Sequence, residues 1–264
     1  MAKKHKERLD KLLVERGLVA TRAKAQAYVM AGEVRVNDEV VTKAGMKVSA
    51  DARLELINQM PYVSRGGYKL AGALEQFEID LTDAICADVG ACTGGFTDVM
   101  LQSGAARVHA IDVGYGQLDW KLRSDERVVV LERTNARYLD TLGEPVSFVS
   151  IDTSFISLKL ILPAVKLWLA DEFDIVALIK PQFEAGKSQV GRGGIVKDPD
   201  VHRAVLEDIL GWCVENGFFP AGLTRSSIEG SDGNVEFLVW LRGVESGLDV
   251  SAEIDLVLEQ SKEN

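Results

Sequence analysis

The sequence is poor in the residues that build metal sites and disulfide frameworks. It holds only three cysteines, Cys86, Cys92 and Cys213, and their spacing is wide and irregular. An odd number of scattered cysteines indicates neither a disulfide framework nor a CxxC site. The three histidines are equally scattered and show no ligand spacing. We therefore expect a chain without a metal centre.

Long apolar runs are also missing. The most hydrophobic segment, LKLILPAVKLWLA, is interrupted by Lys159, Pro163 and Lys166, whereas a membrane-spanning helix needs about 20 mostly apolar residues. The N-terminal MAKKHKERLD is basic but has no apolar segment of the kind found in signal peptides. No strongly amphipathic basic helix points to membrane lysis. We expect a cytoplasmic protein without a membrane partner.

The charge of the chain is uneven along its length. The formal net charge is −10, from 30 Lys and Arg and 40 Asp and Glu. The first 69 residues carry 14 of the basic and 8 of the acidic residues, which leaves 16 basic and 32 acidic residues for the remainder. This asymmetry indicates a basic module attached to an acidic body. A polyanion partner is compatible with that body if the contact face is basic.

The first 58 residues have the pattern of a small α+β module. Apolar residues from Leu9 to Leu13 repeat at helical spacing, and Gly17 closes that helix. Thr21 is a suitable N-cap for a second helix. VRVN, VV and LELI are then typical of short strands separated by turns. So few residues bury only a marginal core, which suits a module attached to a larger one.

This segment, RLDKLLVERGLVATRAKAQAYVMAGEVRVND, resembles the S4 RNA-binding domain in its RLD-x-LL opening, its T-R pair and its G-x-V-x-VN turn. The resemblance implies that Arg8, Arg22 and Lys24 line a face that meets RNA phosphates. Such contacts supply affinity and orientation rather than sequence specificity. The alternative is that these side chains are ordinary solvated helix charges.

The segment NQMPYV that follows is predicted to be a short linker. Pro61 cannot continue a strand ladder, and polar residues precede it. The prediction divides the chain into an S4-like domain at 1–58, a linker at 59–63 and a larger domain at 64–264.

The larger domain alternates between short apolar runs and helical patterns. AICADVG, ARVHAIDV, RVVVLE, VSFVSID and FDIVALIKP are rich in β-branched residues. This alternation is typical of a mostly parallel, doubly wound α/β sheet with helices on both faces. Ligands of such sheets bind at the carboxyl ends of the strands.

A glycine-rich loop, DVGACTGGF, follows the first of these strands. Its G-x-x-x-G-G spacing is not the dinucleotide G-x-G-x-x-G, and the later EAGKS lacks the first glycine of a phosphate-binding loop. Asp112 ends the second strand, where a carboxylate can accept both hydroxyls of a ribose. A ribose carboxylate without a pyrophosphate cradle favours S-adenosylmethionine. The alternative is a tight strand–helix turn without a ligand.

Four charged residues are candidates for catalysis. Asp152 in SIDTSF and Lys180 in ALIKPQFE end the fourth and fifth strands, so they should lie close together. A lysine that closes so apolar a strand should be partly desolvated, which disfavours its charged form. Glu236 lies in the late strand segment GNVEFLVWL, and Lys69 follows the paired glycines of SRGGYKL.

This ordered set resembles the FtsJ-type RNA 2′-O-ribose methyltransferases, in which a Lys-Asp-Lys-Glu tetrad is catalytic. With the S4-like segment, the resemblance extends to the TlyA family of haemolysin A-like rRNA cytidine-2′-O-methyltransferases, from about Lys6 to Trp240. It implies a Rossmann-like methyltransferase fold. It also implies S-adenosylmethionine-binding residues, which are Asp88, Gly90, Gly94, Gly95, Phe96, Asp112 and Asn135.

We expect methyl transfer to a cytidine 2′-hydroxyl of 16S or 23S rRNA, either free or within ribosomal subunits. Lys180 would accept the proton of the hydroxyl, Asp152 and Glu236 would position Lys180, and Lys69 would hold the nucleotide. Either Lys69 or Lys180 could be the lysine that is uncharged before the reaction. Arg65, and Lys187 and Arg192 in the glycine-rich loop that follows, would contact RNA, with that loop closing over it. The alternatives are a non-catalytic RNA-binding assembly factor and a membrane-active haemolysin. The oligomeric state stays open between a monomer and larger forms.

Overall fold

The computed structural model describes residues 6–19, 21–57, 61–230 and 233–259. The chain forms two compact units, residues 1–65 and 66–264, and each is described by itself. The linker predicted at 59–63 lies partly outside the described residues, and the predicted domain limits stay a prediction.

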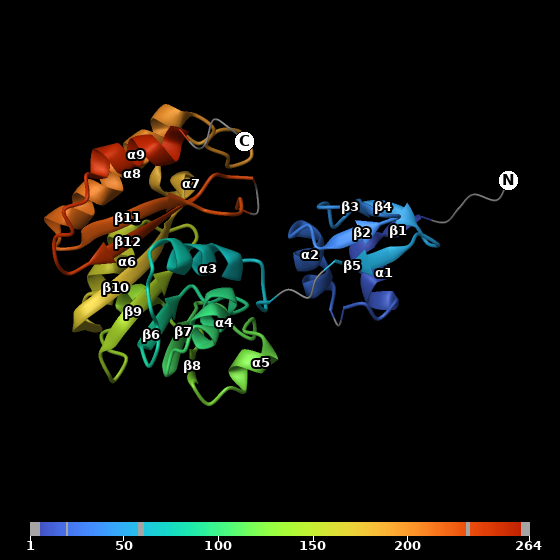
Figure 1. Cartoon of the computed structure of the whole chain (residues 1–264), viewed down its shortest axis with the longest axis horizontal. Coiled ribbons are helices and arrows are strands. Elements are labelled where there is room, and N and C mark those ends of the chain that lie inside the picture. Colours follow the sequence, from blue (N-terminus) through green and yellow to red (C-terminus); the bar gives the residue numbers. More distant parts are fainter. Residues whose placement is uncertain (1–5, 20, 58–60, 231–232, 260–264) are drawn as a thin grey trace. The chain divides into compact units, whose positions relative to one another are not determined.

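The smaller unit is the predicted α+β module, with two helices and short strands (Figure 1). Its elements are β1 (Lys6–Arg8), α1 (Leu9–Glu15), α2 (Arg22–Met30), β2 (Val34–Val36), β3 (Glu39–Val40), β4 (Lys47–Ser49) and β5 (Leu54–Leu56). Strands β3, β2 and β5 form one antiparallel sheet, and β1 pairs with β4 in a second. The sequence pattern did not reveal β1 and β4, because each is three residues long and carries at most one apolar side chain.

Local signals account for the two helices. The Thr21 hydroxyl accepts a hydrogen bond from the Lys24 amide, which confirms it as the N-cap of α2. Leu9 and Leu13 of α1 are fully buried against Ala25 and Val29 of α2, and strand residues complete this core. The unit therefore has a hydrophobic core of its own.

The larger unit is built on one seven-stranded sheet (Figure 1). Its strands are β6 (Ile85–Val89), β7 (Arg107–Ile111), β8 (Val128–Leu131), β9 (Val146–Ile151), β10 (Leu169–Ile179), β11 (Phe219–Arg225) and β12 (Phe237–Arg242). The order is β11-β12-β10-β9-β6-β7-β8, and β12 runs in the direction opposite to the other six strands. The predicted mostly parallel sheet is confirmed.

Helices cover both faces of this sheet. They are α3 (Gly67–Gln76), α4 (Gly95–Gln102), α5 (Trp120–Arg123), the 3-10 turn η1 (Ala136–Tyr138), α6 (Leu158–Val165), α7 (Pro181–Glu184), α8 (Pro199–Glu215) and α9 (Val250–Glu259). Helices α3 and α4 pack together, whereas α6, α8 and α9 form a second group with β11 (Figure 1). The apolar strands are thereby buried on both sides, as their near-continuous hydrophobic pattern requires.

The strand register brings chemistry-bearing residues to one edge of the sheet. Val89 pairs with both Ile111 and Ile151, so the residues that follow these three strands emerge together. Strand β10 ends there as well, at Ile179.

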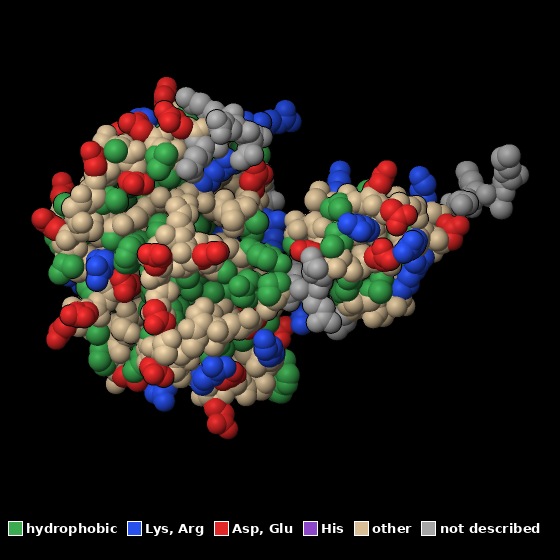
Figure 2. All heavy atoms as spheres, viewed as in Figure 1, with side chains coloured by type: hydrophobic (Ala, Val, Ile, Leu, Met, Phe, Trp, Pro, Cys, Tyr) green, Lys and Arg blue, Asp and Glu red, His purple; other side chains and the backbone are tan. Residues whose placement is uncertain are grey.

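Acidic side chains are spread over the face of the larger unit that Figure 2 shows, in keeping with its negative charge. No helix in the described part of the chain is long and apolar enough to cross a membrane.

Candidate active site

The four predicted catalytic residues form two ion pairs. Lys180 Nζ lies 2.5 Å from Asp152 Oδ1, and Lys69 Nζ lies 2.5 Å from Glu236 Oε2. Lys69 and Glu236 are buried, whereas the Asp152 side chain is 24% exposed. One pair therefore lies in the interior, and the other is accessible to a substrate.

The sheet register explains how the two pairs come together. Strands β10 and β12 are antiparallel and pair Ile179 with Phe237. Continuing this register by one residue places Lys180 opposite Glu236, which lies directly before β12 rather than within it. Asp152 follows β9, the neighbour of β10 on its other side. Lys69 arrives from the first turn of α3. All four residues meet at the carboxyl edge of the parallel strands.

Two residues that the sequence pattern did not single out adjoin Lys180. Its Nζ also donates to the Ser154 hydroxyl at 3.2 Å, and it lies 5.9 Å from the centre of the Phe183 ring. Phe155 stacks at a tilt against Phe183, with ring centres 4.8 Å apart. Phe155 is 89% exposed and has a φ of 63°, a left-handed conformation that is costly for a bulky residue. An exposed aromatic side chain on a strained backbone, linked to a buried lysine through Phe183, is typical of a binding site.

A cavity of about 520 Å³ opens beside Asp152. It is bounded by the residues that follow β6, β7, β8 and β9, and it includes four predicted site residues, Gly90, Asp112, Asn135 and Asp152. Its apolar wall is formed by Val89, Ile111, Val113, Ala136, Phe155, Ile156 and Ile161. The sequence pattern missed this wall, because its residues come from separate loops and strands.

The cavity suits an adenosine-containing cofactor. Gly90 has a φ of +89°, and a Cβ there would overlap the carbonyl oxygen of Asp152, so only glycine allows this close approach. Asp112 accepts hydrogen bonds from the amides of Cys92 at 2.8 Å and Gly114 at 2.6 Å. These bonds fix its carboxylate at the cavity rim, and its remaining lone pairs can accept ribose hydroxyls. Apolar side chains beside a ribose acceptor match an adenine ring and its sugar.

Other predicted cofactor residues lie behind the loop rather than in the cavity wall. Asp88 is fully buried and accepts hydrogen bonds from the hydroxyls of Thr97 at 2.6 Å and Ser150 at 3.1 Å. Burial raises its pKa to about 6, against the opposing effect of these hydrogen bonds. Gly94 caps α4 with a φ of 94°, and Gly95 and Phe96 are buried in its first turn. These residues support the glycine-rich loop on the side away from the cavity.

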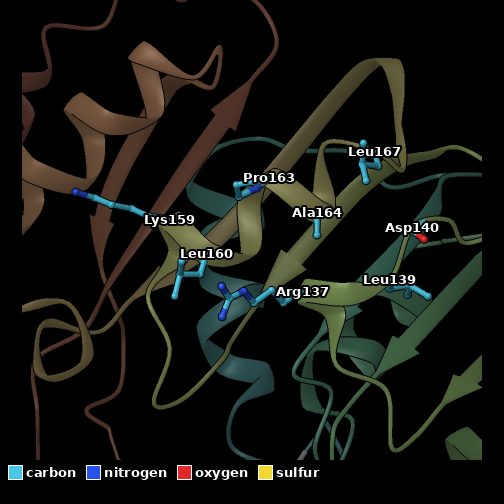
Figure 3. Close-up of a pocket in the computed structure, with 8 residues that line it drawn as sticks. All are labelled: Arg137, Leu139, Asp140, Lys159, Leu160, Pro163, Ala164 and Leu167. Carbon is cyan, nitrogen blue, oxygen red and sulfur yellow. The ribbon is translucent and has the colours of Figure 1, made fainter.

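A second hollow lies outside this site, between η1 and α6 (Figure 3). It has a volume of about 360 Å³ and is lined by Arg137, Leu139, Asp140, Lys159, Leu160, Pro163, Ala164 and Leu167. None of the predicted site residues lines it, and Lys159 is held by Asp208 at 2.7 Å. The hollow therefore adds nothing to the catalytic cluster.

The predicted RNA-contacting residues are divided between the units. In the smaller unit, Arg8 and Arg22 are about half exposed and both bind the buried carboxylate of Asp10. Lys24 lies in the first turn of α2, and the half-buried Arg65 is the last residue of this unit.

In the larger unit, Lys187 and Arg192 are exposed on the loop between α7 and α8. The buried Asn234 accepts the Val196 amide and donates to the Gly194 carbonyl, both at 3.0 Å. These contacts anchor one end of the loop next to Glu236. The sequence pattern missed Asn234, because only the fold brings it to the loop.

Comparison with known proteins agrees with this geometry. Residues 62–243 match the family model described as FtsJ-like methyltransferase, and residues 7–54 match that of the S4 domain. The chain belongs to the FtsJ-like methyltransferase family. The catalytic cluster and the cavity both lie within the first match, and the small α+β unit corresponds to the second.

Two curated relatives illustrate this membership. The chain is 46% identical over 239 residues to the 16S/23S rRNA (cytidine-2′-O)-methyltransferase TlyA of Mycobacterium tuberculosis, covering 89% of each chain. It is 40% identical over 234 residues to a protein of Brachyspira hyodysenteriae named Hemolysin A, covering 88% of this chain and 98% of that one.

Solved structures are similar to the whole chain or to a large part of it. A protein of Streptococcus thermophilus, named as a candidate hemolysin, superposes with a TM-score of 0.78 at 46% identity, covering 99% of this chain and 97% of the other. A methyltransferase of Listeria monocytogenes that depends on S-adenosylmethionine superposes with a TM-score of 0.50 at 16% identity, covering 67% of this chain and 100% of the other. The second likeness shows the methyltransferase fold alone. As a member of this family, the protein is a methyltransferase.

Proposed function

We propose that this methyltransferase transfers a methyl group from S-adenosylmethionine to the 2′-hydroxyl of a cytidine in 16S or 23S rRNA. The observation that carries the proposal is the Lys180–Asp152 pair at the mouth of a cavity suited to adenosine. The relative from M. tuberculosis, whose name states this activity, supports the choice of substrate.

The chain's own residues supply proton transfer and positioning. When bound, S-adenosylmethionine supplies an electrophilic methyl group on a sulfonium. The ribose hydroxyl must lose its proton as its oxygen bonds to the methyl carbon, and Lys180 is placed to accept that proton. Lys180 acts as the base in its neutral form, and the Asp152 carboxylate, 2.5 Å away, orients the amine and compensates the positive charge that forms when it takes up the hydroxyl proton.

The interior pair holds this arrangement. Glu236 lies opposite Lys180 in the strand register and is bound by Lys69, so neither charge is left uncompensated in the interior. A Cβ at Gly230 would lie 2.6 Å from Glu236 Oε1, so this glycine leaves room for the carboxylate. In this proposal, Lys69 and Glu236 fix the end of the sheet on which Lys180 lies, and so help to position it.

The substrate nucleotide would lie against Phe155. An exposed aromatic ring next to the catalytic lysine offers a stacking surface for an unpaired base. The hydroxyl of a ribose attached to that base would then reach Lys180. The S4 domain supplies a second RNA contact through Arg8, Arg22 and Lys24, with phosphate contacts providing affinity.

The proposal is tested with methyl-labelled S-adenosylmethionine and ribosomal subunits that lack the modification. Label should appear in the rRNA and map to the 2′-oxygen of a cytidine. Free 16S and 23S rRNA, assayed in parallel, identify the substrate form. Cofactor binding without label in any RNA would refute the proposed substrate. RNA binding without cofactor binding would favour an assembly factor instead.

A further inference from the structure

We propose that Asp10 is a positioning residue for RNA binding, which holds Arg8 and Arg22 together as one preformed phosphate-binding pair. The inference rests on the proposed function, because it assigns how the smaller unit meets RNA. Asp10 itself cannot bind a phosphate, because both groups carry negative charge.

The geometry converges on one carboxylate. Arg8 donates from Nε to Asp10 Oδ1 at 3.0 Å and from Nη2 to Oδ2 at 2.8 Å. Arg22 donates from Nε to Oδ2 at 3.0 Å, and Gln26 donates from its side-chain amide to the same oxygen at 2.8 Å. The donors come from β1 and α2, while Asp10 itself belongs to α1. Three elements are thus joined at a single acceptor.

Electrostatics explains why a carboxylate occupies this position. Two guanidinium groups close together repel each other, and an anion between them removes that repulsion. The Asp10 side chain is fully buried, and its hydrogen bond from Arg8 holds the pKa of its carboxyl well below the usual range. Asp10 is therefore charged at neutral pH.

The two arginines keep donors for another partner. Their side chains are 45% and 56% exposed. Asp10 engages Nε and Nη2 of Arg8 but only Nε of Arg22, and no other acceptor of Arg22 occurs among the described residues. The Arg8 guanidinium also lies against Gly45, where a Cβ would be 3.2 Å from Nη1. Its side chain is therefore held between Asp10 and the backbone of that turn.

A pair held in this way binds phosphate with a smaller entropic cost. A long, rotamer-rich side chain loses conformational freedom when an interface immobilises it. Here the fold has already removed that freedom, and the unused N–H groups of both guanidiniums can bind phosphate oxygens in their fork geometry.

A positioning role for Asp10 and a purely electrostatic role predict opposite changes in RNA affinity when Asp10 is replaced. Removal of a carboxylate close to a polyanion strengthens binding if only net charge matters. If Asp10 positions the arginines, Asp10→Asn weakens binding although the protein becomes more basic. Asp38→Asn is the matched control. Asp38 belongs to the same unit, is 74% exposed and contacts Arg53 at 3.5 Å rather than Arg8 or Arg22.

The experiment measures binding of the full chain to unmodified transcripts of 16S and 23S rRNA at several KCl concentrations. We expect Asp10→Asn to lose about tenfold in affinity and to lower the slope of log affinity against log salt by about one, as for loss of a phosphate contact. Asp38→Asn should bind as tightly as wild type or more tightly. In an Arg8→Ala, Arg22→Ala background, Asp10→Asn should cause no further loss.

Other results would overturn the inference. If Asp10→Asn binds as tightly as Asp38→Asn, or still weakens binding in the double-alanine background, the residue does not act through the arginines. If Asp10→Asn unfolds the smaller unit, Arg22→Lys is measured instead. Lysine keeps the positive charge but lacks the planar guanidinium that Asp10 orients, so an unchanged RNA affinity would refute the positioning role of Asp10. A wild-type chain that binds cofactor but no rRNA would refute the proposed function, and this inference with it.

Discussion

Lys69 in α3 and Glu236 before β12 are 167 positions apart in the chain, yet Lys69 Nζ donates to Glu236 Oε2 in the interior of the larger unit. The second pair, Lys180 and Asp152, joins residues that follow neighbouring strands. The proposed catalytic cluster therefore consists of one pair buried in the interior and one pair accessible to a substrate.

Loss of either member of the buried pair should destabilise the fold. Lys69→Met leaves the Glu236 charge uncompensated in the interior, which costs about 3–5 kcal/mol of unfolding free energy. Adding Glu236→Leu should recover most of that loss while leaving methyl transfer impaired, because both positioning charges are gone. Urea unfolding and methyl-transfer rates of the two single variants and the double variant check this. Equal stability of Lys69→Met and wild type would contradict it.

Replacement of Lys180 should impair the chemical step. Lys180→Met removes the proposed proton acceptor, so kcat should fall about 100-fold or more, while the affinity for S-adenosylmethionine changes little. Single-turnover methyl transfer and cofactor titration separate the two effects. Lys159→Met is the matched control, because Lys159 is also ion-paired but lies at the second hollow. Near-normal turnover by Lys180→Met would remove Lys180 from the mechanism.

Substitution of Gly90 tests how closely the glycine-rich loop approaches the backbone of Asp152, which follows β9. Gly90→Ala adds a methyl group that overlaps the Asp152 carbonyl at a φ of +89°. Gly143→Ala is matched in conformation, with a φ of +86°, but has open space around the new Cβ. The control should lose about 1–2 kcal/mol from backbone strain. Gly90→Ala should lose more and also weaken cofactor binding. Thermal unfolding and cofactor titration measure both, and similar behaviour of the two variants would exclude a steric contact.

The buried Asp88 should make stability fall as pH rises. Its pKa is raised to about 6 in the folded chain, against about 3.9 when unfolded. Between these values the folded state keeps a proton that the unfolded state has released. Each pH unit therefore lowers stability by about 1.4 kcal/mol, and above about pH 6 the loss is complete.

Asp88→Asn lacks this titration and isolates its contribution. The stability of wild type relative to Asp88→Asn should decrease from about pH 4 to about pH 6 and then stay constant, as measured by urea unfolding across that range. A difference that does not change with pH would show that Asp88 titrates normally.

Phe155 should contribute more to RNA handling than to cofactor binding, although it lines one side of the cavity. Phe155→Ala removes the exposed ring that packs on Phe183, and loss of one base–aromatic stack costs about 1–3 kcal/mol. The kcat/KM for rRNA should therefore fall about 10- to 100-fold, with a smaller change in cofactor affinity. Leu167→Ala, an exposed apolar residue at the second hollow, is the control. Equal kinetics of the two variants would contradict the stacking role.

Much of the fold, and the place of three proposed site residues at one edge of the sheet, could be predicted from local patterns. The alternation of apolar strands with helical segments predicts a mostly parallel sheet, and the parallel pairing of β8, β7, β6, β9 and β10 confirms it. Strand ends in such a sheet meet at one edge, so Asp112, Asp152 and Lys180 could be placed there without coordinates. Thr21 could also be recognised as a helix cap, because capping depends on residues only three positions apart in the chain.

What the sequence determined by itself is therefore local: which residues form strands, helices and caps, and which residue types follow each strand. The tertiary structure alone decided which charges pair, because Lys69–Glu236 and Arg22–Asp10 join distant segments. It also decided that Asp88 lies beneath the loop and that Phe155 is exposed in a left-handed conformation. Burial and pairing depend on every surrounding element, and they set charge state and accessibility, on which the chemistry of this site depends.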